Sequence, residues 1–225
     1  MIKAVVFDFD GVLANSEPLH FRAFRDVLAA HGLRLTEAEY YAEYLGYDDV
    51  GAFRAIARDR GADMSEAQVA ALVDEKAIQL EALERGTSVL FPGAREAVLR
   101  MARRGPIAIA SGARRAEIVR VLDHEGLRDH FPVLVAAEDT PASKPDPAPY
   151  RCAVRLLQTA YGVALDPADC VAVEDSRWGL VSARDAGLRT LAITHSYQAT
   201  ELTEADGIID HLDQLTDDRL KGLAG

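Results

Sequence analysis

Three polar groups stand where predicted buried strands of the chain end, and a fourth, a lysine, lies in a loop before a predicted helix. In chain order they are Asp8 with Asp10, Ser111 with Gly112, Lys144, and Glu174 with Asp175. An aspartate can attack phosphorus to form an acyl phosphate, which splits one difficult displacement into two easier ones. A second carboxylate two residues away, the spacing of Asp8 and Asp10, can protonate the leaving oxygen and later activate water. These residue types therefore indicate phosphoryl transfer through a covalent intermediate.

The charges in this set require a further positive partner. The four carboxylates carry four negative charges when ionised, and Lys144 supplies one positive charge. A phosphate dianion would be strongly repelled by this excess in a medium of low dielectric constant. A divalent cation that prefers oxygen ligands reduces the excess sharply, and a protonated Asp10 nearly removes the rest. Mg²⁺ typically binds one or two carboxylates together with waters and phosphate oxygens, so we expect Mg²⁺ here.

Each polar group taken alone also has an ordinary explanation. An Asp-x-Asp pair at a strand end often forms a turn, and Ser111 is a typical residue at a helix N-terminus. Lys144 fits a solvated loop, and Glu174 with Asp175 can cap a helix that starts at residue 177. These separate explanations leave it to coincidence that all the groups reach one edge of a sheet.

Five short apolar runs and four amphipathic patterns supply the elements that must position these groups. The runs that predict strands are 3–7, 106–110, 132–136, 170–173 and 190–193, and the helical patterns are 94–104, 114–125, 147–161 and 177–186. Because strand and helix alternate from about Phe91 to the end of the chain, the pattern predicts an α/β fold with a doubly wound parallel sheet. In such a sheet, ligands bind beyond the carboxyl ends of the strands.

Residues 15–89 break this alternation. They contain no convincing strand, and turn signals separate helical patterns at 17–31, 36–44, 50–60 and 65–85. A helical block inserted after the first strand predicts a second, smaller domain. We therefore expect a core domain formed by residues 1–14 and 90–225 and an inserted helical cap domain formed by residues 15–89.

The composition is that of an ordinary globular protein with an acidic surface. Its 225 residues include 36 acidic and 25 basic side chains, for a formal net charge of −11. This charge opposes nucleic acid as the main partner and opposes anionic membranes. Cys152 and Cys170 are the two cysteines and form no CxxC motif, which argues against a disulfide scaffold or a cysteine zinc site. We expect a soluble cytoplasmic protein, because no apolar run suits a signal peptide or a membrane span.

The polar groups and their neighbours resemble the motifs of the haloacid dehalogenase superfamily of aspartyl phosphotransferases. The matching segments are Phe7-Asp8-Phe9-Asp10-Gly11-Val12-Leu13, Ser111-Gly112, Ser143-Lys144-Pro145, Val173-Glu174-Asp175-Ser176, Ser16-Glu17-Pro18-Leu19-His20 and Phe91-Pro92-Gly93. The chain is most similar to the branch with a helical cap inserted after the first strand, which includes phosphoglycolate phosphatases and β-phosphoglucomutases. The resemblance implies a Rossmann-like core with that cap.

The resemblance also implies a role for each matching residue. Asp8 would be the nucleophile and Asp10 the general acid and base. Ser111 and the Gly112 amide would hold the transferring phosphoryl group, and Lys144 would neutralise its charge. The presence of Asp10 speaks against dehalogenation, because a halide leaving group needs no proton.

The implied metal and substrate sites extend this set. Mg²⁺ would take Asp8, the backbone carbonyl of Asp10, and Asp175, with Glu174 close by. His20 and Lys76 resemble positions near the substrate entrance of such enzymes. For His20 the alternative is a packed or solvent-facing helix histidine, and for Lys76 it is a solvated helix face.

We expect a phosphatase that acts on a small phosphorylated metabolite, a sugar phosphate or a compound like phosphoglycolate. A phosphomutase would use the same intermediate, but similar mutases carry a basic residue where this chain has Asp48 and Asp49, and Arg54 is the nearby cation that could compensate. A phospho-acceptor module without turnover would need neither Asp10 nor an inserted domain. A monomer is the simplest expectation for the assembly.

Overall fold

A computed structural model describes residues 1–45, 47–85 and 88–223. The chain forms two compact units, which we call the core unit (Met1–Asn15 with Ser88–Gly225) and the helical unit (Ser16–Thr87). Among the described residues, no helix combines the length and the hydrophobicity that a bilayer crossing requires.

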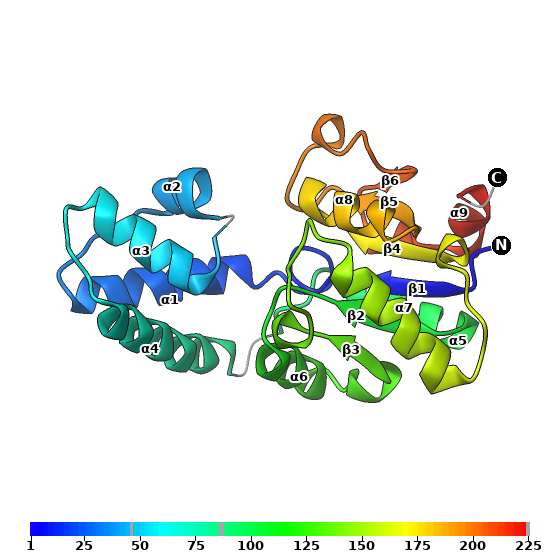
Figure 1. Ribbon diagram of the computed structural model, residues 1–225, viewed down its shortest axis with the longest axis horizontal. Helices are drawn as coiled ribbons and strands as arrows, with labels where there is room; N and C mark the ends of the chain where they lie inside the picture. Colours follow the sequence, from blue (N-terminus) through cyan, green and yellow to red (C-terminus); the bar gives the residue numbers. More distant parts are fainter. Residues whose placement is uncertain (46, 86–87, 224–225) are drawn as a thin grey trace. The chain divides into compact units, whose positions relative to one another are not determined.

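The core unit is built on a six-stranded sheet in the order β3-β2-β1-β4-β5-β6, in which all neighbouring strands are parallel (Figure 1). The strands are β1 (Ala4–Phe7), β2 (Ile107–Ala110), β3 (Val133–Val135), β4 (Cys170–Glu174), β5 (Arg189–Ile193) and β6 (Gly207–Ile209). The first five confirm the predicted strands to within one residue at each end. The edge strand β6 was not predicted, because its three residues include only two large apolar side chains.

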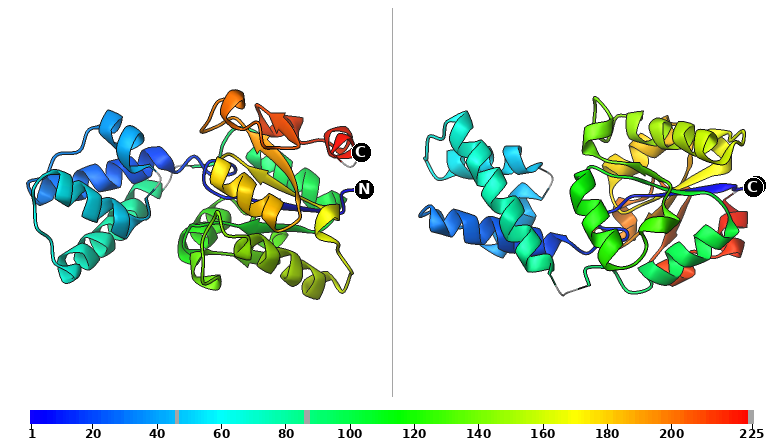
Figure 2. Two further views of the ribbon diagram at one scale, coloured as in Figure 1. Left: turned by 45° about the horizontal axis from the view of Figure 1, so that its top comes forward. Right: turned by 90° about the horizontal axis from the view of Figure 1, so that it is seen from below.

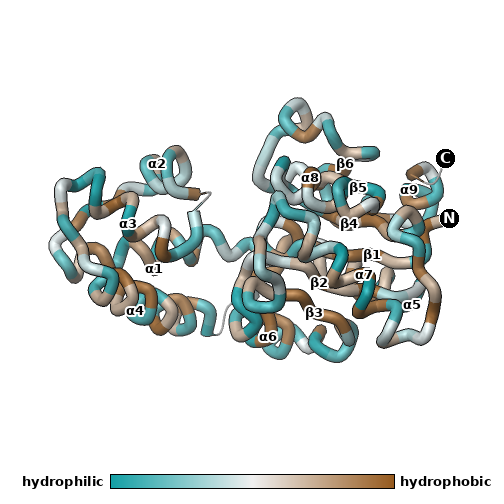
Figure 3. Tube along the Cα trace, viewed as in Figure 1, coloured by the Kyte–Doolittle hydropathy of each residue, from teal (hydrophilic) through white to brown (hydrophobic). Residues whose placement is uncertain are grey.

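Helices cover both faces of this sheet, as a doubly wound fold requires. They are α5 (Ala94–Arg104), α6 (Arg115–His124), α7 (Ala148–Tyr161), α8 (Arg177–Asp185) and α9 (Asp217–Gly222). Figure 2 shows α7 and α5 on opposite faces. Successive strand residues point to opposite faces, so Val6, Ala108 and Val135 pack with Tyr150 and Leu157 of α7 in one buried cluster. The strands run mostly through hydrophobic residues, which matches burial on both faces (Figure 3).

The helical unit consists of α1 (Glu17–Ala30), α2 (Glu37–Glu39), the π-helical segment η1 (Tyr40–Tyr44), α3 (Asp49–Asp59) and α4 (Glu66–Glu84). Its buried cluster includes Phe24 and Phe53, whose ring centroids lie 4.8 Å apart. The helical stretch predicted over 36–44 is confirmed over residues 37–44, but its winding changes from α to π at Tyr40, which the sequence did not predict. Tyr40 and Tyr44, the first and last residues of this π-helical segment, are both buried.

The core unit holds together the two points where the inserted segment leaves and re-enters it. Ala14 and Leu90 form an antiparallel bridge. The backbone N–H of Asn15 donates to the carbonyl of Val89 at 2.6 Å, and the N–H of Phe91 donates to the carbonyl of Leu13 at 2.9 Å. The two chain segments therefore run side by side at this junction.

Candidate active site

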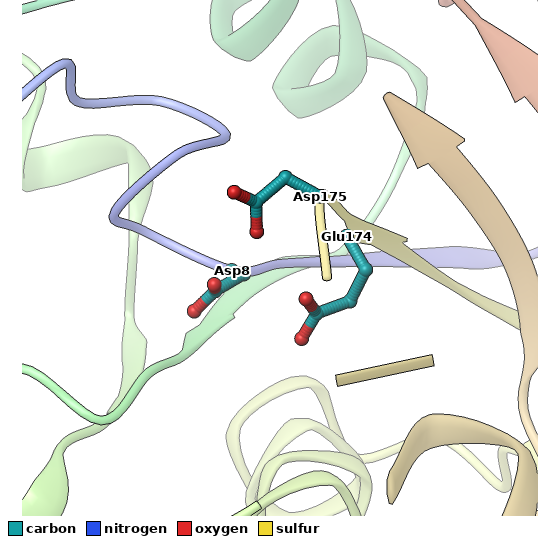
Figure 4. A group of neighbouring side chains, drawn as sticks. All are labelled: Asp8, Glu174 and Asp175. Carbon is teal, nitrogen blue, oxygen red and sulfur yellow. The ribbon is translucent and has the colours of Figure 1, made fainter. Parts of the chain in front are cut away.

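Three carboxylates meet at the carboxyl ends of β1 and β4, the two central strands (Figure 4). Phe7, the last residue of β1, is opposite Val173 of β4, so Asp8 and Glu174 occupy neighbouring positions in the next register step. One oxygen from each of Asp8, Glu174 and Asp175 lies within 4.8 Å of the others. All three residues are buried. The sheet topology thus brings together groups that are more than 160 residues apart in sequence, as the positions of Asp8 and Asp175 show.

Lys144 bridges two of these carboxylates. Its Nζ atom lies 2.8 Å from Oδ1 of Asp8 and 2.6 Å from Oε1 of Glu174. The hydroxyl of Tyr150 donates to the same Glu174 oxygen at 2.6 Å. Burial lowers the pKa of Lys144, but the charges of Asp8 and Glu174 outweigh burial and hold the pKa above its ordinary value. The lysine therefore remains an ammonium ion at neutral pH.

The carboxylates repel one another in the absence of a cation. Burial, followed by the charges of Asp8 and Glu174, raises the pKa of Asp175 well above its ordinary value. Burial also raises the pKa of Glu174, against the opposing charge of Lys144. Three ionised carboxylates and one ammonium leave two negative charges, which one divalent cation balances. Carboxylate oxygens are the ligands that hard divalent cations prefer, so this cluster fits such a cation.

Two glycines provide the space that the carboxylates occupy. A Cβ atom on Gly11 would lie 1.9 Å from Oδ2 of Asp175, and the residue has a φ of +76°, in the left-handed region. A Cβ atom on Gly179, in the first turn of α8, would lie 1.9–2.0 Å from the carboxylate atoms of Glu174. Any side chain at either position would displace a carboxylate.

The remaining predicted core residues lie at the same edge of the sheet. Asp10 follows β1 in a turn and is partly buried, while Ser111 follows β2 and is buried, with Gly112 exposed beside it. The Oγ atom of Ser111 accepts the backbone N–H of Ala113 at 3.1 Å. The alternative of Ser111 as a helix cap is wrong, because α6 begins four residues later, at Arg115.

The helix after β4 is capped by Ser176, and not by Glu174 or Asp175. Ser176 caps α8, and its Oγ atom accepts the N–H of Gly179 at 3.1 Å. Glu174 and Asp175 are thus left for the carboxylate cluster. The explanation of these two residues as helix caps is wrong.

The predicted substrate residues of the helical unit form a separate polar cluster. The Nζ atom of Lys76 lies 2.7 and 3.0 Å from the two carboxylate oxygens of Asp49 and 2.8 Å from Nδ1 of His20. Lys76 is fully buried, so the alternative of a solvated helix face is wrong. Arg54 is exposed and pairs with Glu66. Contact of His20 or Lys76 with substrate remains a prediction.

Three residues were missed from the sequence: two contact the carboxylates, and the third contacts the turn after β1. Tyr150 lies in α7, where a helical pattern gives no sign of its hydroxyl contact with Glu174. Ser196 donates a hydrogen bond from Oγ to Oδ2 of Asp175, and Nδ1 of His195 lies 2.9 Å from the carbonyl oxygen of Gly11. His195 and Ser196 follow β5, so the strand-end rule would have found them if it had been applied to that strand.

Comparison with known proteins identifies the family of this chain. The family model described as haloacid dehalogenase-like hydrolase matches residues 2–187. The chain belongs to this family. The predicted superfamily, the Rossmann-like parallel sheet and the enzyme class, a phosphoric monoester hydrolase of this superfamily, are thereby confirmed.

This haloacid dehalogenase-like hydrolase is similar in sequence or structure to several phosphatases and related proteins. Hexitol phosphatase B of Escherichia coli K12 is 34% identical over 194 residues, which cover 85% of this chain and 83% of that protein. Protein CbbY of Rhodobacter capsulatus is 34% identical over 224 residues, covering 94% of both chains. The crystal structure of CbbY from Rhodobacter sphaeroides in complex with phosphate has a TM-score of 0.84 at 29% identity and covers 99% of both chains.

Proposed function

We propose that this hydrolase is a Mg²⁺-dependent phosphatase that releases phosphate from a small sugar or sugar-alcohol phosphate through an aspartyl phosphate on Asp8. One observation carries the proposal: the ammonium group of Lys144 contacts Asp8 and Glu174 at the sheet edge where Asp175 completes an oxygen cluster. The relatives support the substrate class. One of them is named a hexitol phosphatase, and a CbbY structure was solved with a phosphorylated sugar, xylulose-(1,5)bisphosphate, whose second phosphate we do not expect in the substrate of this chain.

In the first half-reaction, a carboxylate oxygen of Asp8 attacks the phosphorus atom and the bond to the sugar oxygen breaks. Asp10 gives its proton to that departing oxygen, so the products are the free alcohol and the acyl phosphate. Lys144, Ser111 and the Gly112 amide would bind the phosphoryl oxygens. Lys144 suits this task because it is charged and lies 2.8 Å from Asp8.

In the second half-reaction, Asp10 accepts a proton from water as the water oxygen attacks phosphorus. The bond between phosphorus and the Asp8 oxygen breaks, inorganic phosphate leaves, and Asp8 returns to its free carboxylate. Asp10 is then protonated again and ready for the next ester. The same residue therefore acts as acid in one half and as base in the other.

The residues that would hold Mg²⁺ are Asp8, the backbone carbonyl of Asp10, and Asp175, with Glu174 nearby. When bound, the ion offsets the negative charge that otherwise keeps a phosphate dianion away from the Asp8 carboxylate. The contacts of Glu174 with Lys144 and Tyr150 support a role in holding Lys144 and in adding charge near the ion.

For the domains, we propose that residues 1–14 and 90–225 carry the chemistry and that the helical segment 15–89 is a cap that selects the substrate. The independent compactness of the helical unit supports this division. Within it, Lys76 is already paired with Asp49 at 2.7 Å, and Asp48 caps α3. A cation neutralised in this way suits sugar hydroxyls better than a second phosphate, which favours phosphatase activity on monophosphates over the mutase alternative.

The test is a panel of alkyl phosphates that includes sorbitol 6-phosphate, glucose 6-phosphate, β-glucose 1-phosphate and phosphoglycolate. Both free phosphate and isomerised sugar phosphate are followed, with Mg²⁺ and then with excess chelator. We expect chelator-sensitive phosphate release that Asp8→Asn abolishes and Asp123→Asn, a matched change at an exposed position, leaves intact. Isomerisation without release would favour the mutase, and unchanged release by Asp8→Asn would refute the aspartyl-phosphate mechanism.

A further inference from the structure

The loop after β5 brings a histidine ring against the turn that carries Asp10. His195 lies two residues beyond the end of β5, and its Nδ1 atom is 2.9 Å from the carbonyl oxygen of Gly11. The ring of Phe91 stacks on the imidazole, with 3.8 Å between ring centroids and 19° between ring planes. His195 therefore contacts both chain segments that meet at the junction of the inserted region.

The contact acts on a turn whose backbone is closely coupled to Asp10. The N–H of Gly11 donates to the carbonyl of Ala14 at 2.9 Å, and Asp10 itself bridges to Ala14. The N–H of Phe91 donates to the carbonyl of Leu13, also at 2.9 Å. A hydrogen bond to the Gly11 carbonyl, one peptide beyond Asp10, thus fixes the direction in which the chain leaves β1.

The neighbouring residue gives the same loop a second contact with the site. The hydroxyl of Ser196 donates to Oδ2 of Asp175. A Cβ atom on Gly11 would lie 1.9 Å from that oxygen and 3.0 Å from Oγ of Ser196. The turn after β1, the end of β4 and the loop after β5 are therefore in close packing contact. A displacement of the loop after β5 would consequently shift the turn after β1.

We infer that His195 is a positioning residue for Asp10, an inference that rests on the proposed function because it takes Asp10 to be the general acid and base. A carbonyl oxygen accepts hydrogen bonds and does not donate them, so Nδ1 of His195 must carry the proton in its contact with Gly11. Burial lowers the pKa of His195, against the contact with Gly11, and thereby favours the neutral ring with a bare Nε2. The imidazole of His195 thus donates a hydrogen bond to the Gly11 carbonyl and stacks on the ring of Phe91.

The test compares two leaving groups in the variant His195→Phe, which keeps a ring against Phe91 and removes the donor. The ratio kcat/KM reports the first half-reaction. An alkyl phosphate such as sorbitol 6-phosphate needs a proton on its leaving oxygen in that step, whereas p-nitrophenyl phosphate releases a stable anion. Because a general acid contributes a factor of about 100 or more, partial misplacement should lower kcat/KM about tenfold for the alkyl ester and less than about twofold for the aryl ester.

Two further variants separate positioning from general damage. His195→Asn should recover most of the lost rate, because its amide nitrogen can donate from the place of Nδ1. His124→Phe, the same chemical change at an exposed histidine, should alter neither ester. Equal losses on the two esters, or no loss in His195→Phe, would overturn the inference. Wild-type protein that releases phosphate from neither ester contradicts the proposed function instead.

The tautomer of His195 gives a readout that does not depend on activity. We expect ¹⁵N NMR of the imidazole rings at neutral pH to show a ring with protonated Nδ1 and bare Nε2, whose signals disappear in His195→Phe. Protonated Nε2 with bare Nδ1 would remove the contact with Gly11, and it would overturn the inference whatever the kinetic result.

Discussion

Gly179→Ala places a methyl group where the carboxylate of Glu174 now lies. The added Cβ would be 1.9–2.0 Å from the Glu174 carboxylate atoms, whereas ordinary contacts begin at 3.4 Å. The carboxylate must therefore recede by about 1.4 Å, the difference between 3.4 and 2.0 Å. This movement breaks the 2.6 Å contacts of Glu174 with both Lys144 and Tyr150.

Two effects on stability compete in this variant. Alanine is favoured over glycine by about 1 kcal/mol in a helix interior, so the gain at Gly179, in the first turn of α8, is at most about 1 kcal/mol. Overpacking a filled site costs about 1–3 kcal/mol, and a fully buried, hydrogen-bonded carboxylate belongs near the upper end. The expected net loss is about 2 kcal/mol, which lowers Tm by about 4–8 °C in a chain of this size. Displacement of a residue beside the cation site should also lower activity about 10–100-fold.

Thermal unfolding and phosphate release, each measured with Mg²⁺ and with chelator, test this prediction. The matched control is Gly222→Ala, also helical, where an added Cβ meets no atom within 4 Å. This control should keep wild-type activity and a Tm equal to or slightly above that of wild type. A Gly179→Ala protein that is as stable and as active as the control would refute the steric argument.

Three further results are expected. Lys144→Met leaves two buried carboxylates without their cation, so it should destabilise the chelated protein by about 3–5 kcal/mol in urea unfolding; unchanged stability would contradict the pairing. Burial raises the pKa of the Cys170 thiol to about 12, whereas Cys152 is partly exposed. A thiol reagent at pH 8 should therefore modify Cys152 and spare Cys170 until denaturant is added. Peptide mass spectrometry will show which cysteine is modified. Burial raises the pKa of Glu17 despite its bond from Tyr40, so the folded state binds this proton more tightly than the unfolded state. The stability that this group contributes is therefore lost as the pH rises above the ordinary pKa of a glutamate. Relative to wild type, the Glu17→Gln variant should be more stable at pH 7 than at pH 4.5. A difference in unfolding free energy that changes with pH in the opposite direction would contradict this prediction.

Strand ends were the most informative feature of the sequence. Short apolar runs indicate the strands, and parallel strands bring their carboxyl ends to one edge, so the meeting of Asp8 and Glu174 follows from local patterns and one topological rule. Lys144 reaches the two carboxylates from the loop before α7. His195 and Ser196 obey the same rule. Their contribution depends on contacts with Gly11 and Asp175, which no local pattern contains.

Contacts between distant helices were beyond sequence reasoning. Lys76 lies on a helix whose pattern allows a solvated face, yet it is buried because Asp49 and His20 come from two other helices to satisfy its ammonium group. The change from α to π winding at Tyr40 was not predicted either, because both windings place apolar residues on one face at similar spacings.

The junction formed by Ala14 and Leu90 makes the inserted segment modular. Its two ends lie side by side in the core unit, so the core holds the inserted segment as a closed loop. The entropic cost of closing such a loop rises only slowly with its length. Insertions with adjoining ends are the kind that domains tolerate. A different helical insert could therefore be grafted at Asn15 and Val89 without rebuilding the strands. Under the proposed function, such a graft would replace the segment that selects the substrate and leave the reaction at Asp8 unchanged.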